Sequence, residues 1–120
     1  MSDLTKLVNL TSKWAEDRNL IKGSTAKDQT LKLIQEVGEL SDSICKGKNP
    51  VDDIGDCLVV LNNLALQNGL TLSECLEHSY NDIKDRKGIM KDGIFIKEAD
   101  LSLENMLESS YNFKKNTKTL

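Results

Sequence analysis

The sequence is poor in the residues that build zinc sites, disulfide frameworks and membrane spans. It has one histidine, His78, and three cysteines without a CxxC pair, so a zinc site made of histidine and cysteine ligands is not expected. The odd number of cysteines favours reduced thiols and a cytoplasmic protein. No apolar run approaches the roughly 20 residues that cross a bilayer, and the N-terminus lacks a basic segment before an apolar one. We therefore predict a soluble protein with no membrane partner.

The sequence also lacks an excess of positive charge and has few aromatic side chains. The formal net charge is −3, and nonspecific binding to nucleic acid needs a basic surface. We therefore predict no nucleic-acid partner. Aromatic residues make up 4% of the chain, so leucine, isoleucine and valine must supply most of the packing.

One proline and seven glycines separate four stretches with helical periodicity. The predicted helices cover about 3–18, 26–46, 51–67 and 71–86. The Asp92-Gly93 pair between short apolar runs indicates a hairpin or extended arm, and 101–109 are expected to add a short helix. The predicted fold class is all-α, a four-helix bundle with a short C-terminal hairpin or extended arm. It forms one domain over 1–110, followed by a flexible tail over 111–120.

The third predicted helix is unusually apolar. Its back half, "CLVVLNNLALQ", is apolar on nearly every side except at Asn62 and Asn63. A helix of this kind is expected to be buried all round. So short a chain offers too little cover for such a helix, which predicts a partner subunit.

Two acidic pairs border the apolar stripes of consecutive helices. Glu36 and Glu39 lie three residues apart in "LIQEVGEL", and Asp53 and Asp56 have the same spacing on the next helix. Packed together, the four carboxylates would repel one another and lose hydration. A hard cation resolves that conflict, so the pattern predicts Mg²⁺, with Mn²⁺ as an alternative. The other interpretation is two solvated helix edges with ion pairs such as Lys32–Glu36.

These motifs resemble the MazG-like all-α nucleoside triphosphate pyrophosphohydrolases. "EVGEL" (36–40) followed by "DIGDCLVVL" (53–61) is similar to their signature, ExxE on one helix and ExxD on the next. Asp53 stands where the family usually has glutamate, which leaves the reach of that carboxylate and the number of metal ions open. "NDIKDRKG" resembles the family's phosphate-contacting segment, and "DRKGIMKDGIFIKEAD" resembles the arm of small, often phage-encoded members. The resemblance spans roughly 4–98.

The resemblance implies hydrolysis of a nucleoside triphosphate, NTP or dNTP, to the monophosphate and pyrophosphate, by a homodimer or homotetramer. Glu36, Glu39, Asp53 and Asp56 are the predicted metal ligands, and Glu36 or Glu39 is the predicted general base. The predicted substrate-binding residues are Asn81, Lys84, Arg86, Lys32 and Trp14.

All five of these assignments have alternatives, and so does the function. Lys84 and Arg86 either meet the phosphates or complement the macrodipole at an exposed helix end. Asn81 either hydrogen-bonds a phosphate or sugar hydroxyl or is plain helix surface. Trp14 either stacks on a base or belongs to the core, and Lys32 either contacts the substrate or pairs on the surface. The departure at Asp53 also leaves open a nucleotide-binding or partner-binding helical dimer with little turnover.

Overall fold

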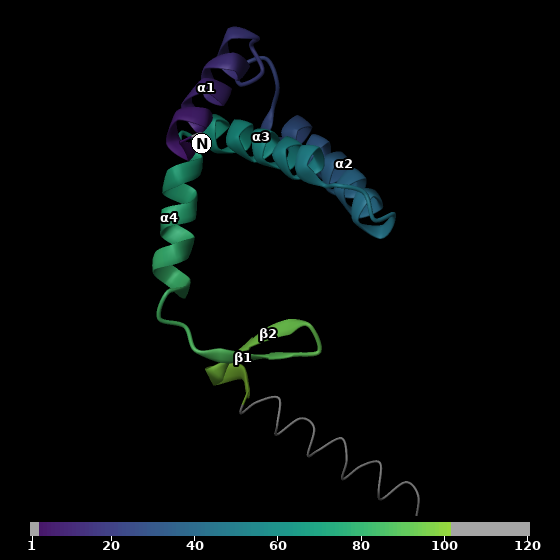
Figure 1. The fold of residues 1–120 in the computed structure, drawn as a ribbon. Helices are drawn as coiled ribbons and strands as arrows, with labels where there is room; N and C mark the ends of the chain where they lie inside the picture. Colours follow the sequence, from purple (N-terminus) through teal and green to yellow (C-terminus); the bar gives the residue numbers. More distant parts are fainter. Residues whose placement is uncertain (1–2, 102–120) are drawn as a thin grey trace, which may run out of the picture. The chain divides into compact units, whose positions relative to one another are not determined.

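The structure is a computed structural model that describes residues 3–101. The described part is mostly helical, with one short two-stranded hairpin, which confirms the predicted all-α class at that level (Figure 1). The helices are α1 (Leu4–Asp17), α2 (Ala26–Cys45), α3 (Val51–Gln67) and α4 (Leu72–Ile83), and the strands are β1 (Gly88–Lys91) and β2 (Ile94–Lys97). The chain divides into two compact units, Met1–His78 and Ser79–Leu120, and each is described by itself.

Side-chain caps explain where the first two helices begin. The Asp3 carboxylate accepts a hydrogen bond from the Thr5 amide at 2.9 Å. At the start of α2, Thr25 and Asp28 form a reciprocal capping box, in which each side chain accepts from the other residue's amide. These contacts satisfy amide groups that have no partner inside the helix.

The loop between α1 and α2 has a conformation that depends on a glycine. Asn19 adopts a left-handed conformation with φ of 58°. The chain then turns back so closely that a Cβ atom on Gly23 would collide with the Asn19 carbonyl oxygen. Only glycine fits this approach, and the turn leads directly into Ser24, whose hydroxyl donates to the Leu20 carbonyl at 2.6 Å.

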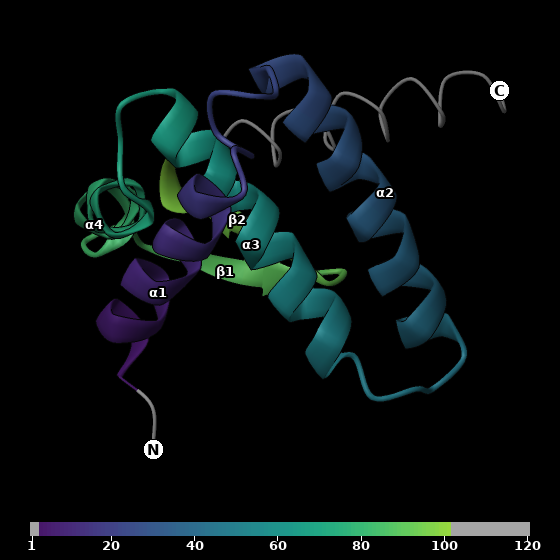
Figure 2. The ribbon, with the colours of Figure 1, turned by 90° about the horizontal axis from the view of Figure 1, so that it is seen from above.

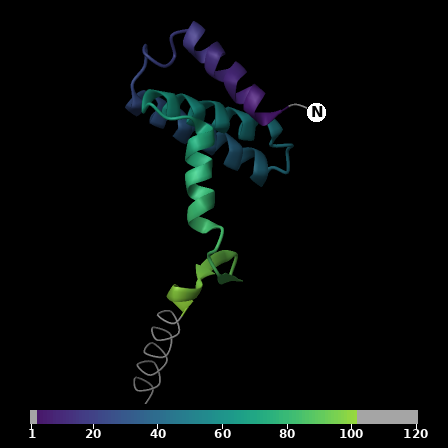
Figure 3. The same ribbon diagram turned by 90° about the vertical axis from the view of Figure 1, so that its left-hand side faces the viewer.

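Helix α3 is the centre of the first unit, because it packs against both α1 and α2 (Figure 2). Helix α1 crosses α3 obliquely, and α2 runs beside α3 (Figure 3). The described buried apolar residues are few and small, namely Ala15, Cys57, Val60 and Ala65. The polar side chains of Gln29, Glu36, Asn62 and Asn63 are also buried, so the interior of this unit is unusually polar.

The single chain does not cover α3 on every side, so the expected burial of this helix by a partner subunit stays a prediction. Leu58 and Leu61 remain 45% and 38% exposed, whereas Asn62 and Asn63 are only 2% and 3% exposed. The asparagines turn inward because they donate hydrogen bonds to Ser12 on α1 and to Gln29 on α2. Periodicity alone does not reveal such partners on other helices.

In the second unit, β1 and β2 pair antiparallel with Lys91 opposite Ile94. The turn residues Asp92 and Gly93 both have positive φ, 51° and 79°, as a two-residue type I′ hairpin requires. This confirms the predicted hairpin. Helix α4 ends at Ile83 rather than near Arg86.

The last predicted elements lie largely beyond the described part of the chain. Residues 98–101 are helical. The rest of the helix predicted over 101–109, and the tail predicted over 111–120, lie outside the described residues. Within residues 3–101, no helix is both long and apolar enough to cross a membrane.

We expect Thr25→Ala to lower the free energy of unfolding by about 1 kcal/mol, because the variant leaves the Asp28 amide without its cap. Thr30→Ala is the matched control, since Thr30 lies inside α2 and its hydroxyl only donates to the Ala26 carbonyl. Urea unfolding followed by circular dichroism measures both variants. Equal stability of Thr25→Ala and the unmodified protein would contradict the expected role of the cap.

Candidate functional site

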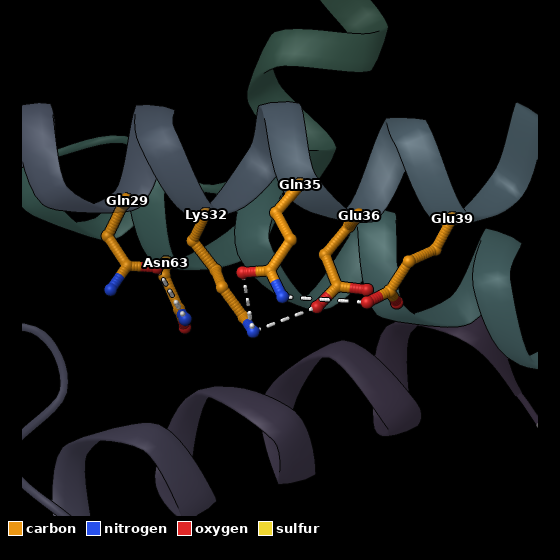
Figure 4. Close-up of polar contacts among 6 residues, drawn as sticks. All are labelled: Gln29, Lys32, Gln35, Glu36, Glu39 and Asn63. Carbon is orange, nitrogen blue, oxygen red and sulfur yellow. Dashed lines mark hydrogen bonds and ion pairs between the residues drawn. The ribbon is translucent and has the colours of Figure 1, made fainter.

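Three of the four predicted metal-binding carboxylates meet between α2 and α3. One oxygen each from Glu36, Glu39 and Asp56 lies within 4.8 Å of the other two. Glu36 and Glu39 are one turn apart on α2, and their carboxylates point toward each other (Figure 4). We call these three residues the acidic trio.

Glu36 has the most enclosed carboxylate of the trio. Its side chain is 8% exposed, and its Oε1 atom pairs with the Lys32 ammonium at 3.2 Å. Its buried Oε2 atom has no hydrogen-bond partner among the described residues. The ion pair considered as an alternative for Glu36 is therefore present, but it uses only one of the two carboxylate oxygens.

The crowding of the carboxylates changes their proton affinity. The neighbouring Glu36 raises the pKa of Glu39, first because a protonated Glu39 can donate a hydrogen bond to the Glu36 carboxylate, and then through charge repulsion. Removal from water is the main cause of the raised pKa of Asp56, and the charges of Asp52, Glu36 and Asp53 add to it. Both shifts have the sign expected where negative charge is concentrated and incompletely neutralised.

Asp53, the fourth predicted ligand, does not belong to the acidic trio. Its charge nevertheless contributes to the raised pKa of Asp56. Asp53 is half-buried near the start of α3, one turn before Asp56. The structure thus brings three of the predicted ligands together and leaves Asp53 beside them.

A cleft among α1, α2 and α3 adjoins the acidic trio. Its volume is about 430 Å³, and the residues that line it are mixed in character. Trp14, Leu20 and Val59 provide apolar surface, whereas Lys32 and Asp56 provide charge. A cleft of this size suits a small molecule with one apolar and one charged part.

Trp14 lines this cleft and is 45% exposed. The interpretation of Trp14 as a core residue was therefore wrong, because the stripe it shares on α1 is only partly covered. The Arg18 guanidinium lies over its ring, 4.6 Å from the ring centroid. Lys32 also lines the cleft while it pairs with Glu36, so the two alternatives for Lys32 are compatible with each other.

Sequence reasoning missed Gln29, a buried residue of this region. Gln29 is 8% exposed and accepts a hydrogen bond from Asn63 at 3.2 Å, and both residues line the cleft. A signal was present, because Gln29 precedes Glu36 by seven positions and Asn63 follows Asp56 by seven. Seven residues are close to two helical turns, so each amide shares a helix face with a carboxylate.

The predicted substrate-binding residues Asn81, Lys84 and Arg86 lie in the second unit. Lys84 donates to the Asn81 side-chain oxygen at 3.4 Å, and Arg86 pairs with Asp82 at 3.3 Å. Asn81 is within α4, and the two cations follow its end. Their role in binding substrate stays a prediction.

The described residues offer no activated thiol near the trio. Cys57 is buried on α3, and burial, followed by the charge of Glu36, raises the pKa of its thiol. A thiol with a raised pKa is a poor nucleophile at neutral pH. The chemistry of this region therefore centres on its carboxylates.

Comparisons with known proteins found one relevant sequence. Over 70 residues the chain is 49% identical to the "Uncharacterized 18.2 kDa protein in rep-hol intergenic region" of Haemophilus phage HP1 (strain HP1c1). The match covers 57% of this chain and 43% of the phage protein, so the chain spans less than half the length of that relative. No protein-family model matches the chain, and no solved structure matches it.

We expect Glu39→Gln to raise the melting temperature at neutral pH in the presence of EDTA. Glu39 has a raised pKa in the folded state, so ionisation of its carboxylate opposes folding above the ordinary value of 4.5. The destabilisation grows as the pH rises through the raised pKa and is absent below 4.5. Melting curves of both proteins across this range should therefore converge at acid pH.

Glu77→Gln is the control for this experiment, because Glu77 is an exposed glutamate of α4 outside the trio. Its melting temperature relative to the unmodified protein should lack the trend described for Glu39. An unchanged melting temperature for Glu39→Gln at neutral pH would show that the neighbouring charges do not oppose folding.

Proposed function

We propose that this protein is a Mg²⁺-dependent hydrolase that converts a nucleoside triphosphate, NTP or dNTP, to the monophosphate and pyrophosphate. The observation that carries the proposal is the acidic trio, in which oxygens from α2 and α3 lie within 4.8 Å beside a cleft. The order of its acidic motifs, which resembles that of MazG-like pyrophosphohydrolases, also supports it. Mn²⁺ is an alternative ion for the same ligands.

The closeness of the three carboxylates supports a small divalent cation as their ligand. Mg²⁺ binds oxygen at about 2.0–2.1 Å, so adjacent oxygens around the ion would be about 3 Å apart. The oxygens of the trio lie within 4.8 Å of one another, and side-chain rotations would have to bring them closer to hold one ion. The unpartnered Glu36 Oε2 is the best-placed ligand atom, since it is buried and lacks a donor among the described residues.

Different residues of the chain have different roles in the proposed reaction. When bound, Mg²⁺ supplies positive charge that offsets the phosphate oxygens. Glu36 or Glu39 accepts the proton of the attacking water as the bond between the α and β phosphates breaks. Glu39 suits this role because its side chain is exposed, whereas Glu36 is buried, so water reaches Glu39 more readily. Lys32 lies close enough to Glu36 to contact a phosphate oxygen as well.

The alternative function is a nucleotide-binding or partner-binding helical dimer with little turnover. The observation in its favour is that Asp53 lies outside the trio, where a longer glutamate would reach further. Calorimetry distinguishes the two functions, because a binding protein takes up nucleotide without consuming it.

We also propose that a second copy of the chain completes the four-helix bundle. Each of the first three helices carries an exposed apolar stripe. On α3 the stripe comprises Val51, Ile54, Leu58 and Leu61, between 70% and 38% exposed. The alternating spacing of three and four residues is that of a helix packed against another helix, and so large an exposed apolar surface is unusual in a monomer. A homodimer or homotetramer covers these stripes.

We expect Glu36→Gln to reduce pyrophosphate release roughly 100-fold, because the variant would hold Mg²⁺ less well and so lose the positive charge that stabilises the reacting phosphates. Asp56→Asn should have a similar effect from the other helix. Glu77→Gln is the control and should retain activity. The assay measures pyrophosphate from a panel of NTPs and dNTPs with Mg²⁺ or Mn²⁺. Absence of pyrophosphate from every nucleotide would refute the proposed activity.

For the assembly, we expect sedimentation of the unmodified protein to give a dimer or tetramer. Leu58→Glu should yield a monomer, because a charge at this position cannot be buried without a partner. Ile89→Glu is the matched control, since Ile89 is also exposed, at 51%, but lies in the hairpin. A monomeric unmodified protein at all concentrations would be the contrary result.

A further inference from the structure

A chain of hydrogen bonds runs from the loop after α1, through α2, to α3. The Ser24 hydroxyl donates to the Leu20 carbonyl at 2.6 Å. Gln29 Nε2 then donates to Ser24 Oγ at 2.9 Å, and Asn63 Nδ2 donates to Gln29 Oε1 at 3.2 Å (Figure 4). We call Ser24, Gln29 and Asn63 the amide relay.

The Leu20 carbonyl determines the direction of every bond in the relay. A carbonyl oxygen can only accept, so the single hydroxyl proton of Ser24 lies between these two oxygens. Ser24 Oγ must therefore accept from Gln29, and it also accepts from Gln67 Nε2 at 3.1 Å. This orients the Gln29 amide with its oxygen toward Asn63. A reversed Asn63 amide would place two carbonyl oxygens face to face.

The relay ends in an acceptor without a partner. Asn63 is 3% exposed, and its Oδ1 atom has no hydrogen-bond partner among the described residues. Buried polar atoms are almost always paired, and Asn63 lines the cleft. A molecule that fills the cleft can satisfy this oxygen only with an N–H or O–H group.

The two ends of the cleft are chemically different. Gln29 and Glu36 lie seven residues apart on α2, and Asn63 and Asp56 lie seven residues apart on α3. This spacing separates the amides from the carboxylates by about 10 Å along the helix axes. Trp14 and Val59 line the same cleft, so it offers apolar and aromatic surface to a planar ring.

We propose that Asn63 Oδ1 recognises an N–H group on the heterocyclic base of the nucleotide, and that Ser24 and Gln29 hold its amide in the accepting orientation. The inference rests on the proposed function for the identity of the ligand. The base lies at the amide end of the cleft, and the phosphates face the acidic trio. Asn63 is thus a specificity-determining residue, and Gln29 is a positioning residue.

The test uses nucleosides without phosphates, and EDTA, so that neither hydrolysis nor metal binding is required. The full ¹⁵N-labelled chain is titrated with adenosine, guanosine, cytidine and uridine. Each is paired with a form whose base N–H groups are methylated. The indole signal of Trp14 reports binding in the cleft, because the chain has a single tryptophan, and the Asn63 amide signal reports the contact itself.

We expect methylation to weaken binding of the preferred nucleoside about tenfold, the size of one lost hydrogen bond. Asn63→Leu should bind the methylated and unmethylated forms of that nucleoside equally. Asn62→Leu is the matched control, since Asn62 is equally buried on α3 but donates to Ser12 on α1, and it should retain the difference between the two forms.

Three results would overturn the proposal. The first is that no nucleoside shifts the indole signal. The second is that the unmodified protein binds the methylated and unmethylated forms equally. The third is that Asn63→Leu still binds the unmethylated form more tightly. The pyrophosphate assay on the unmodified protein separates this failure from failure of the proposed function. Pyrophosphate release without Asn63-dependent binding rejects only the role of Asn63, whereas base recognition without pyrophosphate release rejects only the hydrolysis.

Discussion

The register between α2 and α3 is the constraint on which the rest of the first unit depends. One alignment places Glu36 beside Asp56 and Gln29 beside Asn63. Both contacts are satisfied together because the partners are seven residues apart on each helix. A slip of one helical turn would break the amide hydrogen bond and separate the carboxylates, so the cleft, the acidic trio and the amide relay form or fail together.

This register places polar groups where a small protein usually buries leucine or valine. Hydrogen bonds satisfy the side-chain amide nitrogens, but the oxygens of Asn62, Asn63 and Gln67 have no partner among the described residues. The acidic trio has only Lys32 as a close cation among those residues. Few large apolar side chains are buried in return, and many remain exposed on α1, α2 and α3. Burial of apolar surface is the main source of folding free energy. The polar interior and the exposed apolar stripes therefore arise from the same packing of the three helices. Self-association would bury the stripes.

The helices were predictable to within a few residues, because apolar periodicity and the glycine and proline breaks are local properties of the chain. The position of Glu36 and Glu39 at the edge of the apolar stripe could also be predicted from the sequence. The interpretation of Trp14 as core failed, since periodicity shows which residues share a face but not whether another element covers that face. Gln29, Asn62 and Gln67 were missed for a related reason. Their hydrogen-bond partners lie 34 to 50 positions away in the sequence.

By itself, the sequence determined the helices, the hairpin turn at Asp92-Gly93 and the candidate carboxylates, because each depends on neighbours within a few residues. Only the tertiary structure decided which carboxylates converge, that Asp53 stands apart from them, and that Asn63, which lines the cleft, has a buried oxygen without a partner among the described residues. Those outcomes depend on how α3 packs against α1 and α2. The directions of buried hydrogen bonds and the loss of hydration at Asp56 arise only when the three helices are in place.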